Sequence, residues 1–204
     1  MLKQELLLSE NESLITRDGR LTFHPRFLDV DEADFYFEKL LQQIKWEQYE
    51  IQLFGKKIAQ PRLTAWHGVH QAAYSYSGIS LIPLPFTSEL LSIKQKIESF
   101  TGYTFNSVLL NLYRNNQDSM GWHSDDEKEL GKEPFIASVS LGSSRAFQIK
   151  HKTEKKLKGK IELSHGSLLC MGGLMQSYWQ HAVPKTAIPC KERINLTFRQ
   201  IVER

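Results

Sequence analysis

The segment Arg193–Arg199 constrains the fold of this chain more than any other stretch. Alternation along a β-strand puts four polar side chains on one face, namely Arg193, Asn195, Thr197 and Arg199. The other face carries three apolar side chains, Ile194, Leu196 and Phe198. The apolar face needs a core, and a buried polar face is costly unless a counter-charge neutralises the arginines. A dicarboxylate ligand would supply that charge, since the arginine fork binds carboxylates bidentately. The alternative is an edge strand whose polar face lies in solvent.

The segment Ser107–Arg114 repeats this two-faced pattern. Leu109, Asn111 and Tyr113 share one face, and the opposite face carries Val108, Leu110 and Leu112. Asn111 and Tyr113 would therefore add an amide and a phenol to the same pocket. The alternative is that both groups are satisfied within the interior of the sheet.

A candidate metal site lies between these two segments. His123 and Asp125 are two residues apart, so on an extended strand they point to the same face. A distant residue, for which His181 is the candidate, would complete a facial set. Two histidines and one carboxylate are the donor set that holds non-haem Fe(II) for oxygen chemistry. By itself the pattern is weak, because seven histidines make it easy to find. A surface histidine in an acidic loop is the alternative.

Length and composition indicate one ordinary globular domain. The chain has 204 residues, of which 41% are hydrophobic and 24% charged, with a net charge of +3 that permits an anionic partner. Its two cysteines are typical of reduced thiols. The first residues lack the layout of a signal peptide, and no apolar run approaches the ~20 residues of a membrane span. We expect a soluble monomer without membrane association, cytoplasmic or, in a eukaryote, nuclear.

Periodicity predicts an α+β fold whose core is a double-stranded β-helix, or jelly roll, with helices buttressing one sheet. Helices are expected over about 32–44, capped by Asp29 or Asp31, and over 88–100. Strands are expected at 47–54, 58–66, 104–114, 135–141, 145–151, 160–163, 167–171, 178–183 and 192–202. Residues 1–28 are expected to form a loosely packed arm and 67–86 a loop, and Pro61 indicates an edge or a bulge. The single domain 1–204 would comprise an N-terminal arm and helix (1–46), a nucleotide-recognition region with a hairpin (47–86) and the jelly-roll core (87–204).

Several motifs together carry a family resemblance. In order they are Asn111-x-Tyr113, His123-x-Asp125-Asp-Glu127, Ile136–Gly142, His165-Gly-Ser-Leu168, Trp179-x-His181 and Arg193–Arg199. In type, order and spacing they resemble the AlkB family of Fe(II)- and 2-oxoglutarate-dependent nucleic-acid dealkylases. The resemblance covers roughly residues 50–202 and is closest to the branch that repairs duplex DNA.

The resemblance implies a role for each part of the pocket. Iron would be bound by His123, Asp125 and His181, which are thereby the catalytic residues. The co-substrate 2-oxoglutarate would be held by Asn111, Tyr113, Arg193, Asn195, Thr197 and Arg199. Arg193, with Tyr113, would meet its distal carboxylate, and Arg199 the carboxylate beside the keto group. Molecular oxygen would be the third reactant.

The implied reaction is oxidative dealkylation of bases such as 1-methyladenine and 3-methylcytosine in double- or single-stranded DNA. A methyl group on a ring nitrogen offers no acyl carbon for hydrolysis, so its strong C–H bond must be oxidised. The products would be formaldehyde, succinate, CO2 and the repaired base.

The expected substrate contacts follow the same resemblance: Phe54, Gly55, Lys56, Arg62, Tyr74, Ser75, Tyr76, Asp126 and Glu127. A flipped-out base would stack between the Tyr74–Tyr76 stretch and the ring of His123. Asp126 and Glu127 would favour a base made cationic by alkylation. The alternatives are ordinary loop packing for the tyrosines and a solvated turn for the two acids.

The stretch Leu53–Lys56 resembles a hairpin finger whose Phe54 fills the space that the flipped base leaves in the stack. Phosphates would be contacted by Lys56, Lys57, Arg62 and the basic segment 150–160. For that segment, a solvated hairpin tip is the alternative.

Two other functions remain open from the sequence. One is an RNA or protein demethylase of the same fold, and the other is a non-catalytic jelly roll that binds nucleic acid. The intact iron triad and the two pocket arginines argue against the binding module, because a non-catalytic protein would not require them.

Overall fold

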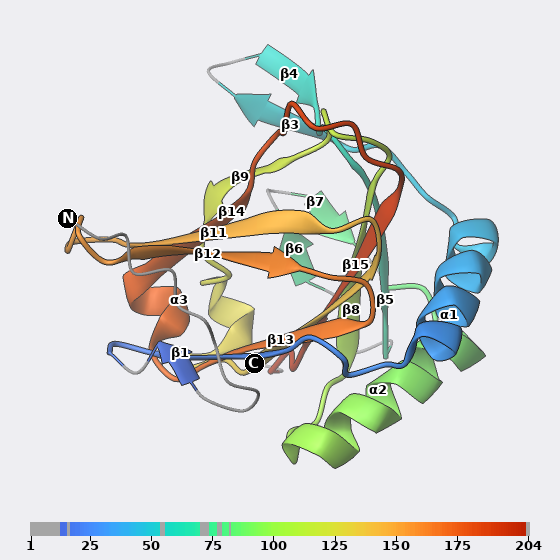
Figure 1. Ribbon diagram of the computed structural model, residues 1–204, viewed down its shortest axis with the longest axis horizontal. Helices are drawn as coiled ribbons and strands as arrows, with labels where there is room; N and C mark the ends of the chain where they lie inside the picture. Colours follow the sequence, from blue (N-terminus) through green and yellow to red (C-terminus); the bar gives the residue numbers. More distant parts are fainter. Residues whose placement is uncertain are drawn as a thin grey trace.

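The computed structural model describes residues 13–15, 17–53, 56–69, 74–76, 79–81 and 83–202. Its strands form a seven-stranded sheet, a four-stranded sheet and two separate hairpins (Figure 1). The larger sheet has the order β1-β2-β13-β10-β15-β8-β5, and its neighbouring strands are antiparallel. The smaller sheet has the order β12-β11-β14-β9 and is also antiparallel. The predicted jelly-roll core is confirmed.

The strands of the larger sheet are β1 (Ser13–Ile15), β2 (Arg20–His24), β5 (Leu63–Gly68), β8 (Ser107–Tyr113), β10 (Ile136–Gly142), β13 (Ser167–Gly172) and β15 (Arg193–Arg199). Those of the smaller sheet are β9 (Met120–His123), β11 (Arg145–His151), β12 (Lys158–Leu163) and β14 (Trp179–Val183). The hairpins are β3 (Glu50–Leu53) with β4 (Lys56–Ala59), and β6 (Tyr74–Tyr76) with β7 (Ile79–Leu81).

Two long helices cover the outer face of the larger sheet (Figure 1). Helix α1 (Val30–Gln43) begins at Asp29, whose carboxylate accepts the Glu32 N–H while the Glu32 carboxylate accepts the Asp29 N–H. Helix α2 (Ser88–Thr101) begins after Thr87 and ends at Gly102, whose φ of +76° suits glycine. Both predicted helices are confirmed. A third helix, α3 (Met175–Tyr178), is a single turn. Among the described helices, none has the length and apolar character to cross a membrane.

Alternation along β15 and β8 separates the core from the pocket, as predicted. Leu110, Ile194 and Leu196 are buried against α1 and α2 in one apolar cluster. The polar residues of the same strands face the space between the two sheets, where they line a cavity. Because a shift of one residue would reverse every side chain, this register fixes both the core and the site.

Three predictions from the sequence are wrong in detail. The strand expected over 58–66 is two strands, because β4 ends at Ala59 and β5 begins at Leu63; Pro61, which has no N–H to donate, lies in the break. The arm expected over 1–28 contains β2, which pairs with β13 and buries Leu21. The loop expected over 67–86 contains the β6–β7 hairpin.

Burial predicts unequal reactivity of the two cysteines. Cys170 lies on β13 between β2 and β10, and burial raises the pKa of its thiol to about 12. Cys190 is only partly buried. Iodoacetamide should therefore modify Cys190 in the native protein and reach Cys170 only in denaturant, since the thiolate is the reactive form. Peptide mass spectrometry gives the two extents, and rapid native modification of Cys170 would contradict the packing of β13.

Candidate active site

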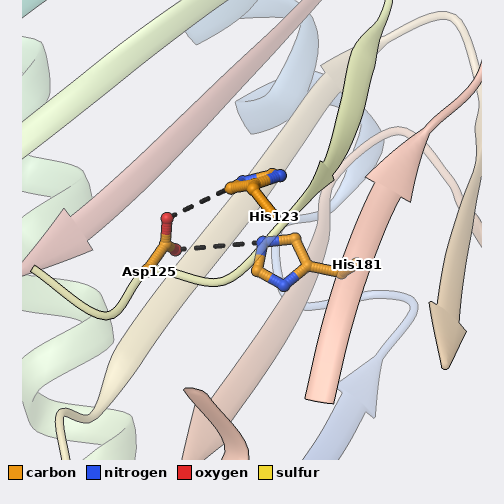
Figure 2. Close-up of side chains that lie close together, drawn as sticks. All are labelled: His123, Asp125 and His181. Carbon is orange, nitrogen blue, oxygen red and sulfur yellow. Dashed lines mark ion pairs between the residues drawn. The ribbon is translucent and has the colours of Figure 1, made fainter. Parts of the chain in front are cut away.

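Three candidate metal ligands converge between the sheets (Figure 2). His123 ends β9, His181 lies opposite it on β14, and Asp125 follows β9 by two residues. Asp125 Oδ1 lies 3.7 Å from His123 Nε2, and Asp125 Oδ2 lies 4.0 Å from His181 Nε2. One donor atom from each residue lies within 4.8 Å of the other two. Two imidazole nitrogens and one carboxylate oxygen form a donor set that suits a divalent ion with open positions.

The protonation states of the buried ligands suit metal binding. Burial alone would raise the pKa of Asp125, but Arg199 and the two histidines nearby lower it to about 2, so the carboxylate is ionised. Burial lowers the pKa of His181 to about 3, so its ring is neutral. His123 Nδ1 lies 2.9 Å from the Gly121 carbonyl, which can only accept, so Nδ1 carries a proton and Nε2 is the nitrogen that is left to bind a metal. An ionised carboxylate and neutral imidazoles are the forms that a metal binds.

The same cavity contains a buried arginine with unused donors. Arg193 is 1% exposed, and its Nη2 donates to Ser140 Oγ at 2.9 Å. Its Nε and Nη1 have no hydrogen-bond partner within the described residues. Burial lowers the pKa of Arg193, and its guanidinium carbon lies 5.1 Å from the centre of the Tyr113 ring. A buried guanidinium with open donors fits an anionic ligand such as the distal carboxylate of 2-oxoglutarate.

The other predicted co-substrate residues line this cavity of about 50 Å³ together with the metal ligands. Asn111 and Tyr113 come from β8, and Asn195, Thr197 and Arg199 come from β15. Arg199 Nη2 lies 2.8 Å from Asp125 Oδ1, so this guanidinium is already paired with a metal-ligand candidate. Asn195 donates to Ser138 Oγ, and Thr197 donates to Asn195 Oδ1. Roles of these residues towards 2-oxoglutarate remain predictions.

The structure revises the role expected for Arg62. Its side chain is 5% exposed, and its Nε donates to Asn111 Oδ1 at 2.9 Å. This interior position argues against the predicted phosphate contact, because the guanidinium is engaged beside the pocket wall. Arg62 therefore belongs to the framework around Asn111.

The remaining substrate residues are placed only in part. Asp126 is exposed, with Oδ2 3.5 Å from Lys152 Nζ, and Glu127 is partly buried. Tyr74, Ser75 and Tyr76 form β6, and Lys56 begins β4. Phe54 and Gly55, the predicted finger, lie outside the described residues.

Arg145 is a framework residue that the sequence pattern did not reveal. It is buried, and its guanidinium donates to the carbonyls of Asn115, Asp118 and Pro184. It lies 5.6 Å from the centre of the Tyr113 ring, which thus has an arginine neighbour in both Arg145 and Arg193. Backbone carbonyls leave no signature in a sequence, so no motif could have indicated these contacts.

Comparison with known proteins shows strong similarity to one group of enzymes. Residues 20–199 match the model of the 2OG-Fe(II) oxygenase superfamily. The chain is 44% identical over 192 residues to human alpha-ketoglutarate-dependent dioxygenase alkB homolog 3, covering 90% of this chain and 66% of that protein. It is 36% identical over 181 residues to human DNA oxidative demethylase ALKBH2, covering 84% of this chain and 69% of that protein. The chain thus spans just under two thirds of the length of the alkB homolog 3 relatives.

A solved structure supports the fold. The structure of OsALKBH1 aligns with a TM-score of 0.59 at 19% identity, covering 88% of this chain and 97% of that chain.

Proposed function

Because this chain belongs to the AlkB family of 2-oxoglutarate- and Fe(II)-dependent oxygenases, we propose that it oxidatively removes alkyl groups from ring nitrogens of bases in DNA. Family membership implies Fe(II), 2-oxoglutarate and molecular oxygen as cofactor and reactants. The observation that carries the proposal is one cavity that joins three convergent metal ligands to the open donors of Arg193.

Different residues of this cavity would bind the metal and the co-substrate. Ionised Asp125, neutral His181 and Nε2 of His123 would hold the metal. Arg193 would bind the distal carboxylate of 2-oxoglutarate, with the Tyr113 ring beside it. When bound, Fe(II) together with 2-oxoglutarate and molecular oxygen would supply the oxidant for the C–H bond of the N-alkyl group. Apolar side chains on the cavity wall, among them Phe147 and Val183, would exclude water.

The exposure and charge of residues around the cavity support binding of an alkylated base and of nucleic-acid phosphates. The side chain of His123 is 27% exposed, so it is the metal-ligand candidate that a flipped base would reach. Asp126, exposed one residue after Asp125, would favour a cationic alkylated base. The exposed lysines Lys57, Lys158 and Lys160 are suited to phosphate contacts. The product, an N-hydroxymethyl base, releases formaldehyde and restores the base.

A coupled-turnover assay tests this function. The purified chain should release formaldehyde and succinate in equal amounts from a DNA oligonucleotide containing 1-methyladenine, with Fe(II), ascorbate, oxygen and 2-oxoglutarate present. Omitting 2-oxoglutarate is the control and should prevent formaldehyde release. Release from methylated RNA but not DNA would favour the RNA demethylase, and no turnover on any methylated substrate would favour a binding module.

Replacing Phe54 by Ala tests the finger hypothesis. We expect activity on duplex DNA to fall more than activity on single strands, because only the duplex needs a side chain to fill the space left by the base. The rates on a matched duplex and single strand give the comparison, with Lys57→Ala as a variant that alters charge but not the finger. Equal losses on both substrates would contradict the finger.

A further inference from the structure

Gln176, a residue of the short helix α3, reaches the backbone of a candidate metal ligand. Its side-chain Oε1 accepts the backbone N–H of Asp125 at 2.9 Å. Gln176 is 2% exposed and Asp125 is also buried, so this bond lies in the interior. The two residues are 51 positions apart in the sequence.

Asp125 needs such a contact because it lies beyond the end of β9. The strand ends at His123, and residues 124–127 have no regular secondary structure. The buried N–H of Asp125 has no partner in a neighbouring strand, and leaving it without a hydrogen bond would be costly. Gln176 Oε1 supplies the acceptor. A second contact steadies the same stretch, since Ser124 Oγ donates to the carbonyl of Trp179 at 2.8 Å. Both contacts come from one continuous segment, α3 and the first residue of β14.

Gln176 is itself fixed in orientation. Its Nε2 lies 3.6 Å from Met171 Sδ, a weak acceptor, and this leaves Oε1 towards the Asp125 N–H. Its backbone carbonyl accepts Lys152 Nζ at 2.9 Å, and Lys152 Nζ also lies 3.5 Å from Asp126 Oδ2. The side-chain amide is therefore held through both Oε1 and Nε2.

We propose that Gln176 is a positioning residue for the metal centre. By holding the main chain of Asp125, it directs the carboxylate towards His123 and His181, and its own side chain does not line the cavity that contains these ligands. This role rests on the proposed function, since it requires the three residues to bind a metal. Partners that orient metal ligands in this way change metal affinity by about 10- to 100-fold in other proteins.

Mn(II) binding to the full chain, measured by calorimetry at constant pH without nucleic acid, tests the proposal. Gln176→Met removes the acceptor at nearly constant side-chain length, and Gln176→Asn keeps an amide too short to reach Asp125. Both variants should raise the Kd for Mn(II) by about tenfold. The matched control is Gln180→Met on β14, the same change at a partly buried residue whose side chain is outside these contacts; its Kd should stay within about twofold of wild type.

Thermal unfolding of the metal-free proteins separates positioning from general stability. A Gln176 variant that melts earlier than wild type but binds Mn(II) with unchanged Kd would overturn the proposal, because Gln176 would then serve only the fold. Using two variants guards against one that does not fold. Failure of the wild-type chain to bind Mn(II) would overturn the metal-dependent function as well, so the two failures are distinguishable.

Discussion

Replacing Arg193 by Met is expected to abolish 2-oxoglutarate binding while leaving the ligand-free protein at least as stable as wild type. Arg193 is fully buried and, within the described residues, its Nε and Nη1 make no hydrogen bond. Burying a guanidinium without a counter-charge opposes folding, and an apolar side chain of similar length removes this cost. The same substitution removes the donors for the distal carboxylate of the ligand.

Thermal unfolding with and without 2-oxoglutarate, in the presence of Mn(II), checks both parts of this prediction. A ligand at about 100 times its Kd stabilises the folded state by about 2.7 kcal/mol, so the wild type should melt later with 2-oxoglutarate and the variant should not. Arg145→Met is the contrasting variant, because Arg145 donates hydrogen bonds to three backbone carbonyls that would lose their donor. The Arg145→Met protein should therefore be clearly less stable than wild type. A persistent ligand-induced shift in Arg193→Met would remove Arg193 from the co-substrate site.

Replacing Asp125 by Ala is expected to eliminate both metal binding and demethylation. Two neutral histidines alone hold Fe(II) poorly. The variant should also unfold more easily, because Arg199 loses its buried carboxylate partner, and breaking such a pair typically costs about 3–5 kcal/mol. Formaldehyde release and denaturant unfolding measure the two effects. Asp126→Ala, which removes an exposed neighbouring carboxylate, should keep metal binding.

The pH dependence of stability gives a second readout for Asp125. The folded-state pKa of about 2 lies below the value of about 3.9 for an unfolded aspartate. Its contribution to the free energy of unfolding is therefore present above about pH 4 and is lost as the pH falls towards 2. Asp125→Ala should show less acid destabilisation in this window. An unchanged acid profile, or retained activity, would contradict the assignment.

Strong periodicity made most of the fold predictable. Apolar residues at helical spacing follow Asp29, and apolar and polar residues alternate along Ser107–Tyr113 and Arg193–Arg199. Both patterns indicate which side chains are buried, and the predicted helix and strands were confirmed. Strand β2 was missed because five residues give little alternation to detect, and its pairing with β13 connects parts of the chain more than 140 residues apart. Pro61 signalled an irregularity in the segment 58–66, but the local pattern does not encode that β4 pairs with β3 while β5 joins the seven-stranded sheet.

The candidate site was predictable where its chemistry requires particular residue types. His123, Asp125 and His181 converge as the donor set suggested, and Arg193 lies in the same cavity. Framework residues could not be identified in this way. Arg62 was assigned to a phosphate contact through the family resemblance, whereas in the structure its Nε donates to Asn111 Oδ1.

The two layers of the sandwich meet through the candidate ligands. Arg199 comes from the seven-stranded sheet, Asp125 lies in the connecting stretch, and His123 and His181 belong to the four-stranded sheet. A cation held by His123, Asp125 and His181 would connect the four-stranded sheet, through Asp125 and its ion pair with Arg199, to the seven-stranded sheet. Metal binding would thus stabilise the packing of the two sheets against each other. Replacing one ligand would lower this stability as well as the rate of the reaction.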